Sequence, residues 1–216
     1  MNTDLLLAEL NRFLMNDQSS IEEQLQVLIR LIVFLWAIHG VNWGFAGGGF
    51  NWVLGNHPRQ LWSLPGIVSC HFLHGVRERV GGRKNNSHIV GNTMAVAVLG
   101  GLVVLQGVNL FVVVSIASGL ISGLGTWLFG RENSYHVGYS GVIFGYFGFL
   151  LVYGFLTGNF VAMGLAILAW LRYGYLLPSI LPLRDGLSWE GHLFGFIGGV
   201  AIAYLIATLR LMNGIN

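Results

Sequence analysis

The sequence has few charged residues, and this scarcity limits the class of protein. Only 9% of its 216 residues are Asp, Glu, Lys or Arg, against about 25% in ordinary soluble domains. Together with 54% hydrophobic residues and a mean hydropathy of +0.67, this excludes a globular domain with one anchor and indicates a polytopic membrane protein. The net charge of +2 is too small to indicate nucleic acid as a partner. Cys70 is the only cysteine, so no disulfide can form within the chain.

The N-terminal part of the chain lacks the basic start and apolar core of a signal peptide. Residues 1–25 are polar and of mixed charge, with leucines and Phe13 spaced as one helical stripe. We expect residues 1–27 to form a short amphipathic segment on the cytosolic side, and residues 211–216 to form a short tail.

Long uncharged runs follow, and a bilayer requires about 20 residues for each helix that crosses it. No charged residue lies between Asn85 and Gly130, and polar breaks near residues 106–109 and 157–159 divide the runs. We therefore expect an all-α bundle of six transmembrane helices over residues 28–210, with an aromatic-rich loop lying in the interface over residues 49–87. The predicted spans lie near 31–48, 88–105, 109–130, 138–156, 160–181 and 190–209.

Glycine is abundant, with 32 copies, about twice its usual share of about 7%. Glycine in membrane helices allows backbones to approach closely. Tight packing of the bundle accounts for most of these residues, and a few could shape a site.

Ser140 lies where a polar loop turns into an apolar run. A serine in a membrane helix usually bonds a carbonyl one turn back and does nothing more. Here Gly138 and Gly141 remove side chains on both sides of the hydroxyl, which would let a substrate backbone approach. The N–H of Ser140 lies at a helix N-terminus, where unpaired donors can stabilise an oxyanion. Ser140 is therefore a candidate nucleophile.

A serine nucleophile needs a base at neutral pH, and His192 is the best candidate. It opens the last predicted span, where interfacial anchoring is the ordinary role of a histidine. Gly195 and Gly199 follow on one face of that span, and Gly141 and Gly145 give the fourth span a matching smooth face. Packing these faces together would make Ser140 and His192 neighbours.

Other histidines offer alternatives. His136 lies four residues before Ser140 and is a rival base, although we expect it in the preceding loop. His88 and Asn92 share a face of the second span and could donate to an oxyanion, or only to neighbouring loops. Glu190 should point away from His192, which favours a Ser-His pair without a carboxylate. The remaining histidines have no spacing typical of metal ligands.

Taken together, these motifs resemble the rhomboid intramembrane serine proteases, in particular bacterial and cyanobacterial-type members. The resemblance rests on Gly-x-Ser-Gly at 138–141, on Gly-His-x-x-Gly-x-x-x-Gly at 191–199, and on His-x-x-x-Asn at 88–92. It covers roughly residues 28–210. The stretch from Arg77 to Asn86 looks inserted, and Phe144 stands where some members carry a tyrosine against the catalytic histidine.

The resemblance implies an intramembrane serine endopeptidase that cuts single-span membrane proteins within or beside the bilayer. Ser140 would be the nucleophile, His192 the general base and acid, and His88 and Asn92 the oxyanion donors. No metal or cofactor would be needed, and the partners would be transmembrane substrates and lipid. A multi-pass protein of a bacterial plasma membrane is expected. The alternatives are a catalytically silent rhomboid-like protein that binds membrane helices, and a small transporter.

Overall fold

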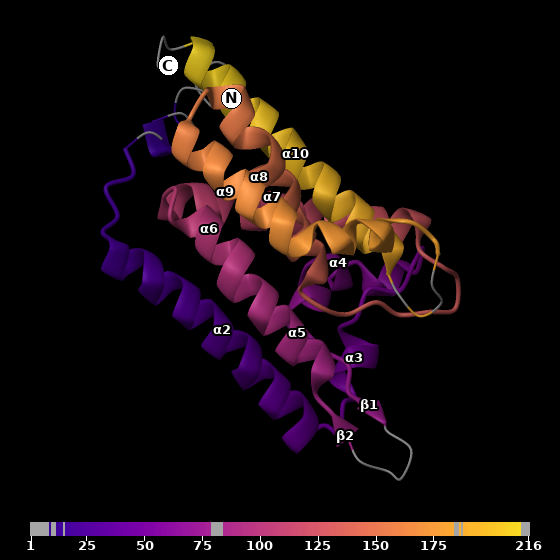
Figure 1. The fold of residues 1–216 in the computed structure, drawn as a ribbon. Helices are drawn as coiled ribbons and strands as arrows, with labels where there is room; N and C mark the ends of the chain where they lie inside the picture. Colours follow the sequence, from indigo (N-terminus) through magenta and orange to yellow (C-terminus); the bar gives the residue numbers. More distant parts are fainter. Residues whose placement is uncertain are drawn as a thin grey trace.

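The computed structural model of the chain describes residues 9, 12–14, 16–78, 84–183, 186 and 188–212. Six of its segments are long and apolar enough to cross a membrane, which confirms the predicted all-α bundle (Figure 1). The segments are α2 (Ile21–Gly44); α5, η3 and α6 in series (Ser87–Ala95, Val96–Gly100, Gly101–Val104); α7 (Val108–Phe129); α8 (Ser140–Thr157); α9 with η4 (Phe160–Tyr173, Gly174–Ile180); and α10 (Trp189–Met212).

The first span begins about ten residues earlier than predicted, at Ile21 instead of residue 31, so the boundary placed after residue 27 falls inside α2. A capping box starts this helix: Ser20 accepts a bond from the Glu23 N–H, and the Glu23 side chain accepts one from the Ser20 N–H. The first turns are polar, and hydropathy therefore does not mark them. Most of the predicted amphipathic segment before them, at 1–8, 10, 11 and 15, lies outside the described residues.

The connection between α2 and α5 is built from short elements instead of one extended loop. They are α3 (Phe50–Val53), η1 (Leu61–Ser63), α4 (Gly66–Ser69), η2 (Cys70–Phe72) and the antiparallel strands β1 (Arg77–Glu78) and β2 (Lys84–Asn85). The inserted-looking basic stretch thus contributes two short antiparallel strands, and residues 79–83 between them lie outside the described residues.

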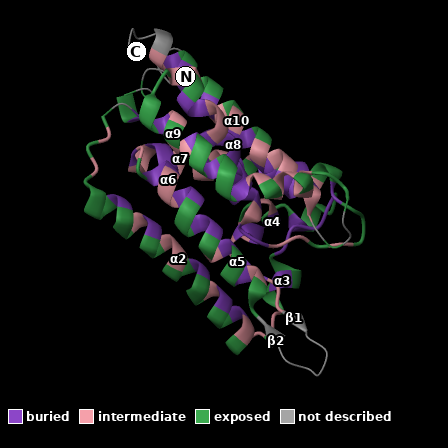
Figure 2. Ribbon diagram, in the orientation of Figure 1, coloured by how far each residue is buried: buried purple, intermediate pink, exposed green. Residues whose placement is uncertain are grey.

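Helix α8 is the centre of the bundle and the most buried of the six spans. Its aromatic residues Tyr146, Phe147 and Phe149 are fully enclosed. By contrast, α2 lies on the outside and presents many exposed apolar side chains (Figure 2). An outer surface of this kind suits contact with lipid, where exposed apolar groups carry no hydration cost. The centre of the bundle is thus a rigid support for whatever side chains α8 presents at its N-terminal end.

Candidate active site

Ser140 is the first residue of α8, so its N–H belongs to the unpaired donors of a helix N-terminus. The turn before it depends on Gly138, whose φ of +130° is one that residues with a side chain rarely adopt. A β-carbon there would also come within 2.8 Å of His88 Nε2. The Gly138 N–H donates to the Cys70 carbonyl, which ties the turn to η2. The absence of a side chain at Gly138 therefore lets the turn before Ser140 pass close to the ring of His88.

His192 lies in the first turn of α10, and its Nε2 is 3.0 Å from Ser140 Oγ. Its other ring nitrogen, Nδ1, is 3.1 Å from the backbone carbonyl of Ser179 in η4. A carbonyl can only accept, so Nδ1 carries the proton and Nε2 is left to accept the Ser140 hydroxyl proton. The carbonyl of Ser179 orients the imidazole as a carboxylate does in a three-residue triad.

The glycine faces of α8 and α10 meet directly and bring these two side chains together. A β-carbon added at Gly195 would overlap the carbonyl oxygen of Gly141, and one at Gly199 would overlap that of Gly145. A third helix, α7, packs on the same seam, where Ser118 and Ser122 occupy the space that side chains at 145 and 141 would need. Ser122 also donates to the Gly191 carbonyl across 2.8 Å, which fixes the N-terminal end of α10 beside Ser140.

Phe144, one turn after Ser140, stacks on the imidazole of His192. The ring centroids are 4.4 Å apart and the planes differ by 18°. Together with the Ser179 carbonyl, this contact holds both the plane and the rotation of the imidazole. The absence of a hydroxyl at this position leaves the stacking intact.

His88 and Asn92 line the same cavity as Ser140 from α5. The Asn92 side-chain nitrogen is 2.9 Å from Nε2 of His74, which lies between η2 and β1. An amide nitrogen carries two hydrogens, so the second remains available toward the cavity. Burial lowers the pKa of His74 to about 3, with His88 and His39 adding to the effect. His74 is therefore neutral and able to accept this bond.

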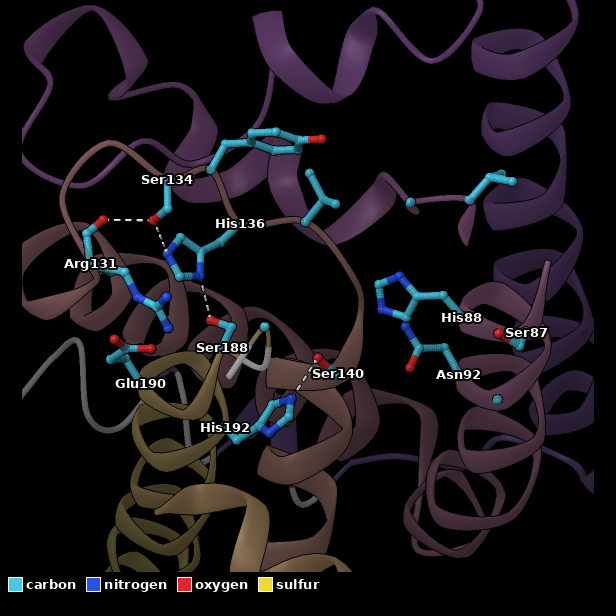
Figure 3. A pocket seen from close by; sticks show the side chains of 16 residues that line it. Ser87, His88, Asn92, Arg131, Ser134, His136, Ser140, Ser188, Glu190 and His192 are labelled. Carbon is cyan, nitrogen blue, oxygen red and sulfur yellow. Dashed lines mark hydrogen bonds between the residues drawn. The ribbon is translucent and has the colours of Figure 1, made fainter. Parts of the chain in front are cut away.

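His136, the rival base, is occupied elsewhere. Its Nε2 is 3.0 Å from Ser134 Oγ and its Nδ1 is 2.7 Å from Ser188 Oγ. Burial, followed by the charge of Arg131, lowers the pKa of His136 to about 4. With both nitrogens bonded to serines of the loops, His136 does not act on Ser140. Glu190 lies on the same side of the cavity, away from the Ser140–His192 pair (Figure 3).

Ser140, His192, His88, Asn92 and His136 line one cavity of about 560 Å³. Ser140 and His192 lie in its middle, His88 and Asn92 on one side, and Arg131, His136 and Glu190 on the other (Figure 3). An activated serine, an oriented base and donors aimed at a shared space can perform acyl transfer.

Two contributors were missed by reasoning from the sequence. The spacing of His74 does not mark it as a metal ligand, and its place shortly before α5 is the one sequence signal that could have pointed to it. The Ser179 carbonyl has no side-chain signature at all.

Comparisons with known proteins identify the family of this chain. The rhomboid domain family matches residues 58–209, more than half of the chain. An uncharacterized protein of Mycobacterium tuberculosis strain H37Rv is 36% identical over 72% of this chain and 64% of its own length. An uncharacterized protein of Mycobacterium leprae is 39% identical over 57% of this chain and 52% of its own length.

A Bacillus subtilis protein named "Putative rhomboid protease YdcA" is 28% identical over 85% of this chain and 93% of its own length. The chain thus spans less than two thirds of the length of the mycobacterial relatives. The family match covers five of the six spans and every residue that lines the cavity. By this match the chain belongs to the rhomboid family, and it is a multi-pass membrane protein.

Proposed function

We propose that this protein is an intramembrane serine endopeptidase of a bacterial plasma membrane, which cuts single-span membrane proteins. The observation that carries the proposal is the pair of bonds at His192, one to Ser140 Oγ and one to the Ser179 carbonyl. These bonds give the imidazole the tautomer that a general base needs. A histidine that only anchors a helix at the interface needs no such arrangement.

The reaction follows from the geometry. Ser140 Oγ attacks the carbonyl carbon of the substrate while its proton passes to His192 Nε2. The negative oxygen accepts bonds from the Ser140 N–H and from donors of His88 and Asn92. His192 then gives its proton to the leaving nitrogen, and the peptide bond breaks. A water molecule hydrolyses the resulting ester in the same way, with His192 again taking and returning a proton.

The catalytically silent alternative keeps the fold without the chemistry. A silent protein would not require the Ser140 hydroxyl to face an oriented base. The 3.0 Å contact between Ser140 Oγ and His192 Nε2 therefore favours the enzyme. The transporter alternative expects polar groups and broken helices in the middle of the membrane. The polar groups of the cavity instead gather at and just before the N-terminal ends of α5, α8 and α10 and in the loop between α7 and α8.

Labelling with a fluorophosphonate serine probe tests the proposal. Purified, detergent-solubilised wild type, Ser140→Ala and His192→Ala would be compared, with folding checked by circular dichroism. We expect labelling of the wild type only. A folded wild type that does not label would support the silent alternative.

A further inference from the structure

One end of the active-site cavity consists of polar groups that the proposed reaction does not use. We call it the acceptor end and define it by Arg131, Ser134, His136, Ser188 and Glu190. It lies across the cavity from His88 and Asn92, with Ser140 and His192 between the two (Figure 3).

The hydrogen bonds of this end have a fixed direction. Ser134 Oγ donates to the Arg131 carbonyl across 2.6 Å, so it accepts from His136 Nε2. His136 Nδ1 then carries no proton and accepts from Ser188 Oγ. Ser188 Oγ donates its only hydrogen in this bond, and its lone pairs can still accept a bond from another donor.

Glu190 adds a second acceptor. It is only 5% exposed and lines the cavity, and its Oε2 atom has no hydrogen-bond partner among the described residues. A buried oxygen without a partner is costly, which points to a donor that arrives with a ligand. Glutamate in a first helical turn also interacts favourably with the helix dipole, but that role does not require burial.

The tetrahedral carbon at Ser140 decides which part of a substrate reaches this end. One substituent is Ser140 Oγ itself, the oxygen faces Asn92, and the leaving nitrogen must face His192 Nε2 to receive its proton. The remaining substituent is the α-carbon on the acyl side of the scissile bond. A side chain on that α-carbon can therefore extend into the acceptor end, which lies across the cavity from Asn92.

We propose that the acceptor end is a specificity site for the residue on the acyl side of the scissile bond, and that it selects a neutral hydrogen-bond donor such as threonine. This inference rests on the proposed function. Arg131 and Glu190 bring opposite charges to the same end, so a lysine would bring a second cation beside Arg131. The threonine hydroxyl would donate to one of the two acceptor oxygens, of Ser188 or of Glu190, whereas an apolar side chain would donate to neither.

Peptide aldehydes test this selection, because Ser140 Oγ adds reversibly to the aldehyde carbon and its proton passes to the new hemiacetal oxygen. The compounds are acetyl-Ala-Ala-X aldehydes in which X is threonine, its isostere valine, or lysine. Each competes with fluorophosphonate labelling of the wild type. We expect threonine to compete about tenfold better than valine, since one buried hydrogen bond accounts for a change of that order. Lysine should not exceed threonine.

Two variants locate the effect. Ser188→Ala and Glu190→Leu should each bring the ratio of the threonine and valine aldehydes' potencies as competitors toward one. The fluorophosphonate should still label Ser140 in both variants. Thr208→Ala, which removes an exposed hydroxyl at the far end of α10, is the matched control and should keep the wild-type ratio. Ser188 precedes α10 and is not part of the helix, so Ser188→Ala still tests the acceptor end if Glu190→Leu does not fold.

The outcomes separate this inference from the proposed function. If the wild type is labelled but the threonine and valine aldehydes compete equally well, the acceptor-end selection alone is overturned. Preference for lysine overturns the selection of a neutral donor. A folded wild type that does not label overturns the proposed function and this inference together.

Discussion

The side-chain amide of Asn92 donates to Nε2 of His74 across 2.9 Å, and both residues are buried. The pair joins α5 to the segment between η2 and β1. The carbonyl of His74 itself accepts bonds from Trp43 Nε1 and Asn51 Nδ2, so its position is fixed from α2 and α3. A network that starts on the outermost helix thus determines where the Asn92 amide points.

Asn92→Ala should reduce the rate of fluorophosphonate labelling roughly 100- to 1000-fold, because loss of one oxyanion donor has an effect of that size. Labelling rates on detergent-solubilised protein would measure it. An unfolded variant would show that Asn92 is structural, and an unchanged rate would remove it from the site.

His74→Leu should slow labelling as well, because Asn92 loses the acceptor that orients it. A double-mutant cycle separates this role from a merely structural one. If His74 acts through Asn92, His74→Leu will cost much less in the Asn92→Ala background than in the wild type. His74→Gln, whose amide oxygen can accept the same bond, should recover part of the rate. Additive losses would contradict the link.

Gly199→Val should abolish labelling by forcing α10 away from α8. The added side chain would overlap the Gly145 carbonyl, and overpacking of a tight interface costs about 1–3 kcal/mol even where some relaxation is possible. Gly164→Val in α9 is the matched control, because a β-carbon there meets nothing within 4 Å. Equal labelling of the two variants would count against glycine packing as the support of the site.

Phe144→Leu should slow labelling about two- to tenfold, because an aromatic pair contributes roughly 0.5–1.5 kcal/mol beyond the burial of its area. Phe144→Tyr keeps the ring and should stay near the wild-type rate. The ratio of the two variants measures the stacking on His192. A slow tyrosine variant beside a normal leucine variant would show that bulk, not stacking, matters here.

Acid should destabilise the fold through His136 and His74, which lie outside the spanning helices. Burial lowers the pKa of His136 to about 4 and that of His74 to about 3. Both are neutral in the folded protein, while the unfolded chain binds their protons below about pH 6.5. Their contribution to the free energy of unfolding is therefore complete above pH 6.5. It is lost as the pH falls toward 4 for His136 and toward 3 for His74, by about 1.4 kcal/mol per pH unit for each histidine.

Thermal unfolding in detergent at pH 7.5, 5.5 and 4.5 would measure this loss. The variant His136→Gln should lose less stability than the wild type over the same range, since it removes one of the titrating groups. Parallel curves for the two proteins would show that His136 does not titrate on unfolding.

Much of the fold could be predicted because its signals are local. Uncharged runs of about 20 residues indicated the six spans, since a bilayer imposes that length on any helix that crosses it. The prediction failed at the start of α2, because four of the six residues from Ile21 to Gln26 are polar although they belong to the helix. A capping box is a local signal as well, but hydropathy does not detect it.

The sequence by itself determined that this is a membrane bundle with Ser140 and His192 at the mouths of two helices. Glycine spacing also determined which faces could pack, because it repeats within single helices. Only the tertiary structure decided that the Ser179 carbonyl orients the base, that His74 orients Asn92, and that Ser188 and Glu190 form the acceptor end. The first two of these contacts join residues 13 and 18 positions apart, and one uses a backbone carbonyl that every residue type carries. No periodicity along a helix can report such contacts, because they arise only when separate elements pack together.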